Sequence, residues 1–163
     1  MQPLGKIILD TNICVDLFNG NLLESVLKLP DSFLLPDVIL AELKEPTGNS
    51  LISLGYISHQ LSSDAVQIVF QYAGIYTKPS RTDLFALVAA KTSNITLLTG
   101  DDNLRKAADK EKVDVHGLLW LIDKLFDAQI VLGPQLSDSL DIIVAKGAWL
   151  PQKDVQRLKE KWK

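Results

Sequence analysis

The chain of 163 residues has few of the features that mark secreted or membrane-spanning proteins. A single cysteine, Cys14, excludes an internal disulfide framework and fits a reducing compartment. The apolar stretch "GLLWLI" stops at Asp123, far short of the ~18 residues that a membrane span needs. The N-terminal "MQPLGKIILD" has too short an apolar run for a signal peptide. We therefore expect a cytoplasmic protein that makes no use of a membrane.

The chain also lacks an excess of positive charge. Its formal net charge is −3, so bulk electrostatics do not indicate a nucleic-acid-binding protein. Hydrophobic residues make up 47% and charged residues 23% of the chain, the proportions of an ordinary globular protein. The sequence has no internal repeat, low-complexity segment or clear linker, and its length suits one domain.

Apolar runs alternate with amphipathic stretches along most of the chain. The pattern predicts strands at 6–9, 32–35, 95–99 and 113–117, with a weaker candidate at 55–61, and a loop at 45–50. It predicts helices at 10–20, 36–45, 62–74, 80–93, 101–112, 118–129, 137–147 and 152–163. Strands that alternate with helices indicate a parallel sheet covered on both faces. The expected fold is therefore an α/β three-layer sandwich with a central, mostly parallel sheet.

Two acidic residues stand where predicted strands end. Asp10 follows "KIIL" directly, and Asp101 follows "ITLLT" with Gly100 between. Asp is a good helix N-cap, which offers a structural explanation for each. Ligands of parallel sheets, however, bind beyond the carboxyl ends of the strands. Both residues are therefore candidates for a site as well as for a cap.

Two further acidic residues lie in apolar surroundings. Glu42 is the one charge in "VILAEL", and Asp83 precedes the dense apolar run "LFALVAA". A charge that faces a core is costly unless it is paired or binds a cation, and Glu42 has no basic partner at helical spacing. We therefore expect Glu42 to be at least partly buried.

Four converging carboxylates would repel one another strongly unless a proton or a divalent cation relieved the repulsion. Such hard oxygen ligands suit Mg²⁺ or Mn²⁺. Acidic clusters that hold these ions recur in enzymes that cleave phosphodiesters, because the ion activates water and offsets charge on the phosphate.

Several neighbours of these acids have two possible roles. Asn12 and Thr99 could orient a carboxylate or satisfy local backbone groups. Asp102 is either a ligand or an acidic residue of a first helical turn. Among the basic residues, Arg81 and Arg105 are candidates for contacts to RNA phosphates, with solvated charge as the alternative. We expect no catalytic role for His59 or His116, which stand in no nucleophile or base constellation.

The ordered pieces "IILDTN", "PDVILAEL", "SRTDLFALVAAK" and "LLTGDDNLRKAA" together resemble the PIN-domain family. The resemblance covers residues 6 to about 120. It implies a Mg²⁺- or Mn²⁺-dependent ribonuclease, often a VapC-type toxin that forms homodimers and is neutralised by a small antitoxin. It also implies that the catalytic residues and metal ligands are Asp10, Glu42, Asp83 and Asp101. We prefer Asp101 to Asp102 because Leu104 then follows as the packing residue of the motif.

The chain continues beyond the usual end of such a domain. We expect a PIN-like domain at 1–133 and a helical extension at 134–163 that packs on the same domain. The extension contains Trp149 and Trp162 and could cover the site, form a dimer contact or bind a partner. The family resemblance does not assign it a role.

Two alternatives belong to other functional classes. A haloacid-dehalogenase-like phosphatase also carries an Asp after its first strand, but it needs a second Asp where this chain has Asn12. A non-catalytic PIN-like module that binds nucleic acid or protein is the other alternative, because a fold does not imply a function.

Overall fold

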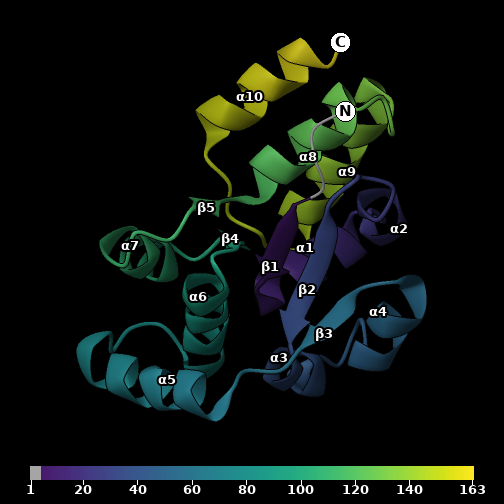
Figure 1. Ribbon diagram of the computed structural model, residues 1–163. Coiled ribbons are helices and arrows are strands. Elements are labelled where there is room, and N and C mark those ends of the chain that lie inside the picture. The colour runs from purple at the N-terminus through teal and green to yellow at the C-terminus, as the bar shows by residue number, and fades with distance from the viewer. Residues whose placement is uncertain (1–4) are drawn as a thin grey trace.

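The computed structural model describes residues 5–163 and has a central five-stranded sheet (Figure 1). Every pairing in the sheet is parallel, and the strand order is β3-β2-β1-β4-β5. The strands are β1 (Lys6–Leu9), β2 (Ser32–Pro36), β3 (Ile57–His59), β4 (Thr96–Leu98) and β5 (Val115–His116). The chain winds outward from β1 to β3 and then returns to the other side of β1, so the strand order reverses between β1 and β4.

Helices cover both faces of this sheet. They are α1 (Thr11–Asn19), α2 (Leu23–Val26), α3 (Asp37–Glu42), α4 (Gly48–Leu54), α5 (Ser63–Ile75), α6 (Arg81–Ser93), α7 (Asp102–Lys110), α8 (Leu118–Asp127), α9 (Gly133–Ala145) and α10 (Gln152–Lys161). One group is centred on α6, which contacts β1, β2 and β4 as well as α5 and α7. The other group joins α1, α2, α8, α9 and α10. The predicted three-layer α/β fold is confirmed.

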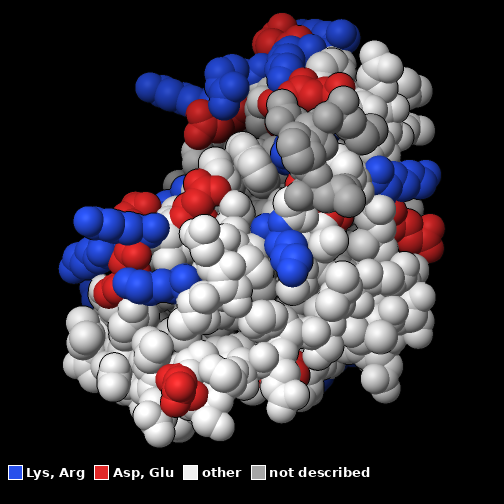
Figure 2. All heavy atoms as spheres, in the orientation of Figure 1, with Lys and Arg blue, Asp and Glu red and all other residues white. Residues whose placement is uncertain are grey.

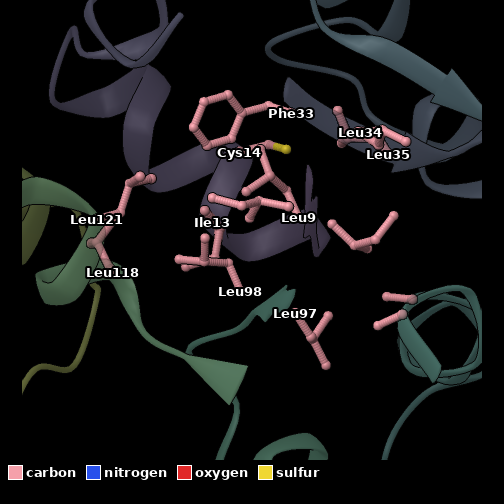
Figure 3. Packing of buried hydrophobic residues seen from close by; sticks show 14 of the residues in the cluster. Leu9, Ile13, Cys14, Phe33, Leu34, Leu35, Leu97, Leu98, Leu118 and Leu121 are labelled. Atoms are coloured by element: carbon pink, nitrogen blue, oxygen red, sulfur yellow. The ribbon is translucent and has the colours of Figure 1, made fainter. Parts of the chain in front are cut away.

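The sheet is the centre of one hydrophobic core. Residues of β1, β2, β4, α1 and α8 contribute to it, as Figure 3 shows, and Ile8, Leu9 and Leu97 are fully buried. The inner strands β1, β2 and β4 are largely apolar on both faces because helices cover both faces of the sheet there. Nearly every residue of α6 from Leu84 to Ala90 is buried too, as expected for a helix without a clear polar face.

Part of the predicted loop at 45–50 is the start of a helix. The Oγ1 of Thr47 accepts the backbone N–H of Ser50 at 3.1 Å and caps α4, which begins at Gly48. A Cβ atom on Gly48 would lie 2.2 Å from the carbonyl oxygen of Leu40. A glycine at position 48 therefore allows the backbone at the start of α4 to approach that of Leu40 closely. It does not mark a loop, as the sequence pattern had suggested. The sequence analysis also missed the four-residue helix α2, and α5 ends at Ile75 rather than at Gly74.

The last two helices pack against the rest of the chain. α9 contacts α1 and α8, and α10 contacts α8. Trp162 is 1% exposed, its ring lies 6.5 Å from that of Phe126, and its Nε1 donates to Asp123 at 3.0 Å. A Cβ on Gly133 would lie 1.8 Å from the carbonyl oxygen of Trp162. The end of the C-terminal helix is thereby fixed against the second half of α8 and the start of α9. Within residues 5–163, no helix has the length and apolar character needed to cross a membrane.

We predict that Trp162→Ala lowers the free energy of unfolding by about 3–5 kcal/mol, because the truncation leaves a cavity and removes the hydrogen bond to Asp123. Urea denaturation would measure this change. Trp149→Ala is the matched control, because its ring is 77% exposed, and it should change stability by less than about 0.5 kcal/mol. Equal losses in the two variants would contradict the anchoring role of Trp162.

Candidate active site

The first and fourth predicted acids follow the two strands between which the strand order reverses. Asp10 follows β1, Thr99 follows β4, and the backbone N–H of Asp10 donates to the carbonyl of Leu98 at 3.2 Å. In open α/β sheets the crevice at this reversal is where ligands bind. The topology therefore supplies a site at the position that the sequence suggested.

Asp10 is buried and fully hydrogen-bonded. It is 1% exposed, caps α1 by accepting the N–H of Ile13 at 2.9 Å, and accepts the hydroxyl of Thr99 on its other oxygen. Burial raises the pKa of Asp10 to about 7, and these two hydrogen bonds offset the rise only in part. The nearby charges of Asp83 and Asp16 raise the pKa further. The carboxylate is thus fixed in position while its negative charge lacks a compensating cation.

Thr99 ties two of the acidic segments together. Its Oγ1 donates to Asp10 and accepts the backbone N–H of Asp101 at 3.0 Å. Asp101 in turn caps α7, because its Oδ1 accepts the N–H of Asn103 at 3.0 Å. Thr99 fills both of the roles that the sequence left open, because its hydroxyl orients a carboxylate and also satisfies a local backbone N–H group.

Asp83 lies at the start of α6. It forms a capping box with Ser80, in which each side chain accepts the other residue's backbone N–H at 3.0–3.1 Å. Burial, followed by the charges of Asp101 and Glu42, raises the pKa of Asp83 against these hydrogen bonds. Its side chain is therefore held by α6 within electrostatic reach of three other acids, because Asp10 also responds to its charge.

Glu42 is exposed, contrary to the expectation drawn from its apolar neighbours. It is the last residue of the short helix α3, so its side chain leaves the helix end rather than a buried face. Its Oε1 accepts the hydroxyls of Thr11 at 2.6 Å and Thr82 at 3.3 Å. These two threonines, one after Asp10 and one before Asp83, were missed by the sequence analysis although each adjoins a predicted acid.

The four acids form an electrostatically linked group around Asp83. They do not form a ready metal cage: among residues 5–163, no three side chains of His, Cys, Asp or Glu lie close enough together to hold an ion as they stand. Three of the four are fixed by hydrogen bonds to backbone N–H groups at helix starts. Coordination by this group would require its side chains to rotate from the arrangement described.

A fifth acid, Asp16, belongs to the same region. It is half-buried, burial raises its pKa to about 6, and its charge acts on Asp10. Asn12 lies four residues before it, on the same side of α1. The sequence carries a signal for Asp16 in "DTNICVD", where it stands four residues after Asn12, but this residue was not predicted as part of the site.

The remaining candidates lie outside the group around Asp83. Asp102 is exposed in the first turn of α7. Arg105 is half-buried, and its guanidinium donates to the carbonyl of Thr99 at 3.5 Å. Arg81 is exposed and lies over the ring of Phe70, 5.2 Å from its centre, so it points toward α5. His116 lies parallel to the ring of Trp120, in keeping with a structural role.

A cleft of about 550 Å³ opens beside Thr99. Its walls come from α1, from the segments that follow β4 and β5, and from the connector between α9 and α10. Lining residues include Asn12, Asp16, Thr99, Asp102, Arg105, Trp120 and the connector 146–151. Asn12, Asp102 and Arg105 are thus brought together in this cleft rather than in the group around Asp83.

The comparisons with known proteins agree with this fold. A family model described as a PIN domain matches residues 6–163. A PilT N-terminus domain protein from the archaeon Sulfolobus solfataricus P2 superposes with a TM-score of 0.52 at 14% identity, covering 74% of this chain and 93% of the other. VapBC2 from Rickettsia felis, bound to a DNA fragment from its promoter, gives a TM-score of 0.51 at 20% identity, covering 69% and 98%.

No curated protein matches the sequence. The two solved structures are too distant in sequence to show more than the fold. The family model, in contrast, spans nearly all of the chain, including α9 and α10. The chain therefore belongs to the PIN-domain family.

Proposed function

We propose that this protein is a metal-dependent endoribonuclease that hydrolyses RNA phosphodiester bonds. The observation that carries the proposal is the group of four acids, in which Asp10 and Asp101 follow β1 and β4, Glu42 ends α3 and Asp83 lies in the first turn of α6. Burial, and to a lesser extent repulsion by neighbouring acids, raises the pKa of Asp10 and of Asp83, which is the electrostatic setting of a cation site. Membership in the PIN-domain family supports nuclease chemistry.

The donor set fits Mg²⁺ or Mn²⁺, because its members are carboxylate oxygens without nitrogen or sulfur ligands. Asp10, Asp83 and Asp101 would hold the ion, with Glu42 at the exposed side. When bound, such an ion supplies an activated water and offsets charge on the phosphate. Thr99 and the backbone N–H of Ile13 fix the Asp10 carboxylate, and Thr11 and Thr82 fix that of Glu42.

The same fold supports a role as the toxin of a toxin–antitoxin pair. The VapBC2 complex of Rickettsia felis shares the fold, and on that basis we propose a small antitoxin protein as partner, a homodimeric state and a cytoplasmic location. A phosphatase of the haloacid-dehalogenase type is not retained, because the family model identifies a PIN domain. No observation on the described residues favours a non-catalytic module.

We predict that Asp10→Asn abolishes cleavage of labelled single-stranded RNA in Mn²⁺ or Mg²⁺ while the protein stays folded. The reason is that an amide lacks the charge needed to hold the cation, yet it keeps the cap of α1. Wild-type protein in EDTA should be equally inactive. Asp64→Asn, an exposed acid in the first turn of α5, is the matched control and should cleave normally. Metal-stimulated cleavage by Asp10→Asn would reject the assignment.

A second prediction concerns Thr99. Thr99→Val keeps the shape of the side chain but removes the hydrogen bond to Asp10, and we expect cleavage to fall by about 10–100-fold, the usual effect of losing a group that orients a metal ligand. Thr99→Ser restores the hydroxyl and should recover most of the activity. Metal titrations of cleavage would show whether the loss lies in metal affinity. Equal activity of the valine and serine variants would contradict this role.

The raised pKa of Asp10 also predicts how stability depends on pH. Because the pKa rises from 3.8 to about 7 on folding, ionisation of Asp10 opposes folding. The stability that protonated Asp10 contributes is lost as the pH rises from 3.8 to about 7. Asp10→Asn does not ionise and therefore does not lose stability in this way. Without metal, the melting temperature of Asp10→Asn should exceed that of the wild type by more at about pH 8 than at about pH 5. The same difference at both pH values would contradict the shift.

A further inference from the structure

The cleft beside Thr99 has the features of a nucleotide subsite. We propose that it binds one unpaired nucleotide of the RNA substrate, with the base on the ring of Trp149 and the adjoining phosphate near Arg105 and Lys146. The inference rests on the proposed ribonuclease function, because it names where that substrate is held. Three independent observations support it. The cleft adjoins the group of acids, the ring of Trp149 is exposed, and Arg105 and Lys146 have no carboxylate partner among the described residues.

The cleft is continuous with the group of acids. Thr99 lines the cleft and also donates its hydroxyl to Asp10. Asp16, whose charge acts on Asp10, lines the cleft as well. The volume of about 550 Å³ lies within the range of pockets that bind small organic molecules. A chain whose phosphate reaches the acids can therefore place a neighbouring nucleotide in the cleft.

Trp149 differs from the other two tryptophans. It is 77% exposed and has no stacking or cation partner among residues 5–163. The ring of Trp120, also on the cleft wall, already lies 4.0 Å from that of His116 and 4.6 Å from the Nζ of Lys124. Trp162 is buried. A bare indole face on a cleft wall is a stacking platform for a base.

The cations of the cleft are available to a phosphate. Neither Arg105 nor Lys146 has a carboxylate partner within 4.0 Å in the described chain. Asp154 at the far end is paired with Arg157 at 3.6 Å. Gly117 makes room for Arg105, because a Cβ there would lie 2.8 Å from its Nη2. The guanidinium thus has a place built for it, held by the carbonyl of Thr99.

The connector 146–151, which carries Trp149, is held at both ends by packed helices. It follows α9 and leads into α10, which Trp162 anchors, and Figure 1 shows it passing β4 and β5 on the way. Gly147 has a φ of +113°, which disfavours any other residue, and nothing lies within 4 Å of where its Cβ would be. Gly100, on another wall of the cleft, is equally open. Bare backbone in two walls permits close approach by a ligand.

The basic surface of α10 is a weaker candidate for RNA binding. Its cations lie among acidic groups, as Figure 2 shows. Lys159 pairs with Asp141, and Lys161 pairs with Asp123 and Asp127. These pairs hold α10 in place and leave little net positive charge.

The test measures binding apart from cleavage. In the Asp10→Asn background, the probe is a 5′-fluorescein-labelled, random-sequence, single-stranded RNA of about 20 nucleotides, long enough to cover several stacking sites, read by fluorescence anisotropy. We expect Trp149→Ala to weaken binding by about 10-fold, the loss of one stacked base, and Trp149→Phe to retain most of the affinity. Lys146→Gln should reduce the slope of log K against log salt concentration by the amount expected for about one phosphate contact. Ile75→Ala, an exposed apolar residue on α5, is the control and should bind normally.

Two outcomes would overturn the subsite. One is Trp149→Ala binding the RNA as tightly as the Ile75→Ala control, and the other is a fully paired RNA duplex competing as well as the single strand. Failure of the proposed function is a separate result, because it appears as absence of cleavage by the wild type in Mn²⁺. In cleavage assays with Asp10 intact, Trp149→Ala should raise KM with little change in kcat. Asp10→Asn, in contrast, should abolish turnover.

Discussion

Repulsion between carboxylates that share one edge of the sheet is the constraint around which this structure is organised. Asp10, Asp83 and Asp101 each carry negative charge at the start of a helix, where the partial positive charge of the helix dipole faces them. Their hydrogen bonds come mainly from backbone N–H groups, which belong to the fold and cannot move away. The helices α1, α6 and α7 therefore offset in part the repulsion that their own acids create. The pKa of Asp10 nevertheless stays raised, chiefly because the side chain is buried and in addition because Asp83 and Asp16 lie near it.

The capping role and the site role of these acids are thus not alternatives. A cap needs an oxygen directed at the first free N–H groups of a helix, and a cation site needs oxygens held at fixed positions near a strand end. One carboxylate has two oxygens and can serve both needs. In Asp10 one oxygen caps α1 while the other meets Thr99, so a capping residue also becomes a positioned member of the acidic group.

The fold and the acids could be read from the sequence because they depend on local patterns. Apolar runs such as "KIIL" and "ITLLT" predict the strands, and Asp10 and Asp101 follow these two runs within two residues. The exposure of Glu42 could not be predicted, because it depends on α3 ending at that residue. Likewise Gly48 marks a tight contact with Leu40 and not a loop, and the cleft wall joins residues separated widely in the chain. Each of these features arises from tertiary packing, which periodicity does not encode.

The hydrogen bond between Thr99 and Asp10 joins residues 89 positions apart. It forms only when β4 has inserted beside β1, a pairing that must follow closure of a long loop and is therefore a late, slow event in folding. Helices and the β1–β2 pair can form earlier without assembling the acids. A newly made or partly unfolded chain accordingly carries its carboxylates as separate caps. The contact between Thr99 and Asp10 therefore reports that β4 has paired with β1, and folding itself sets the moment at which the acidic segments come together.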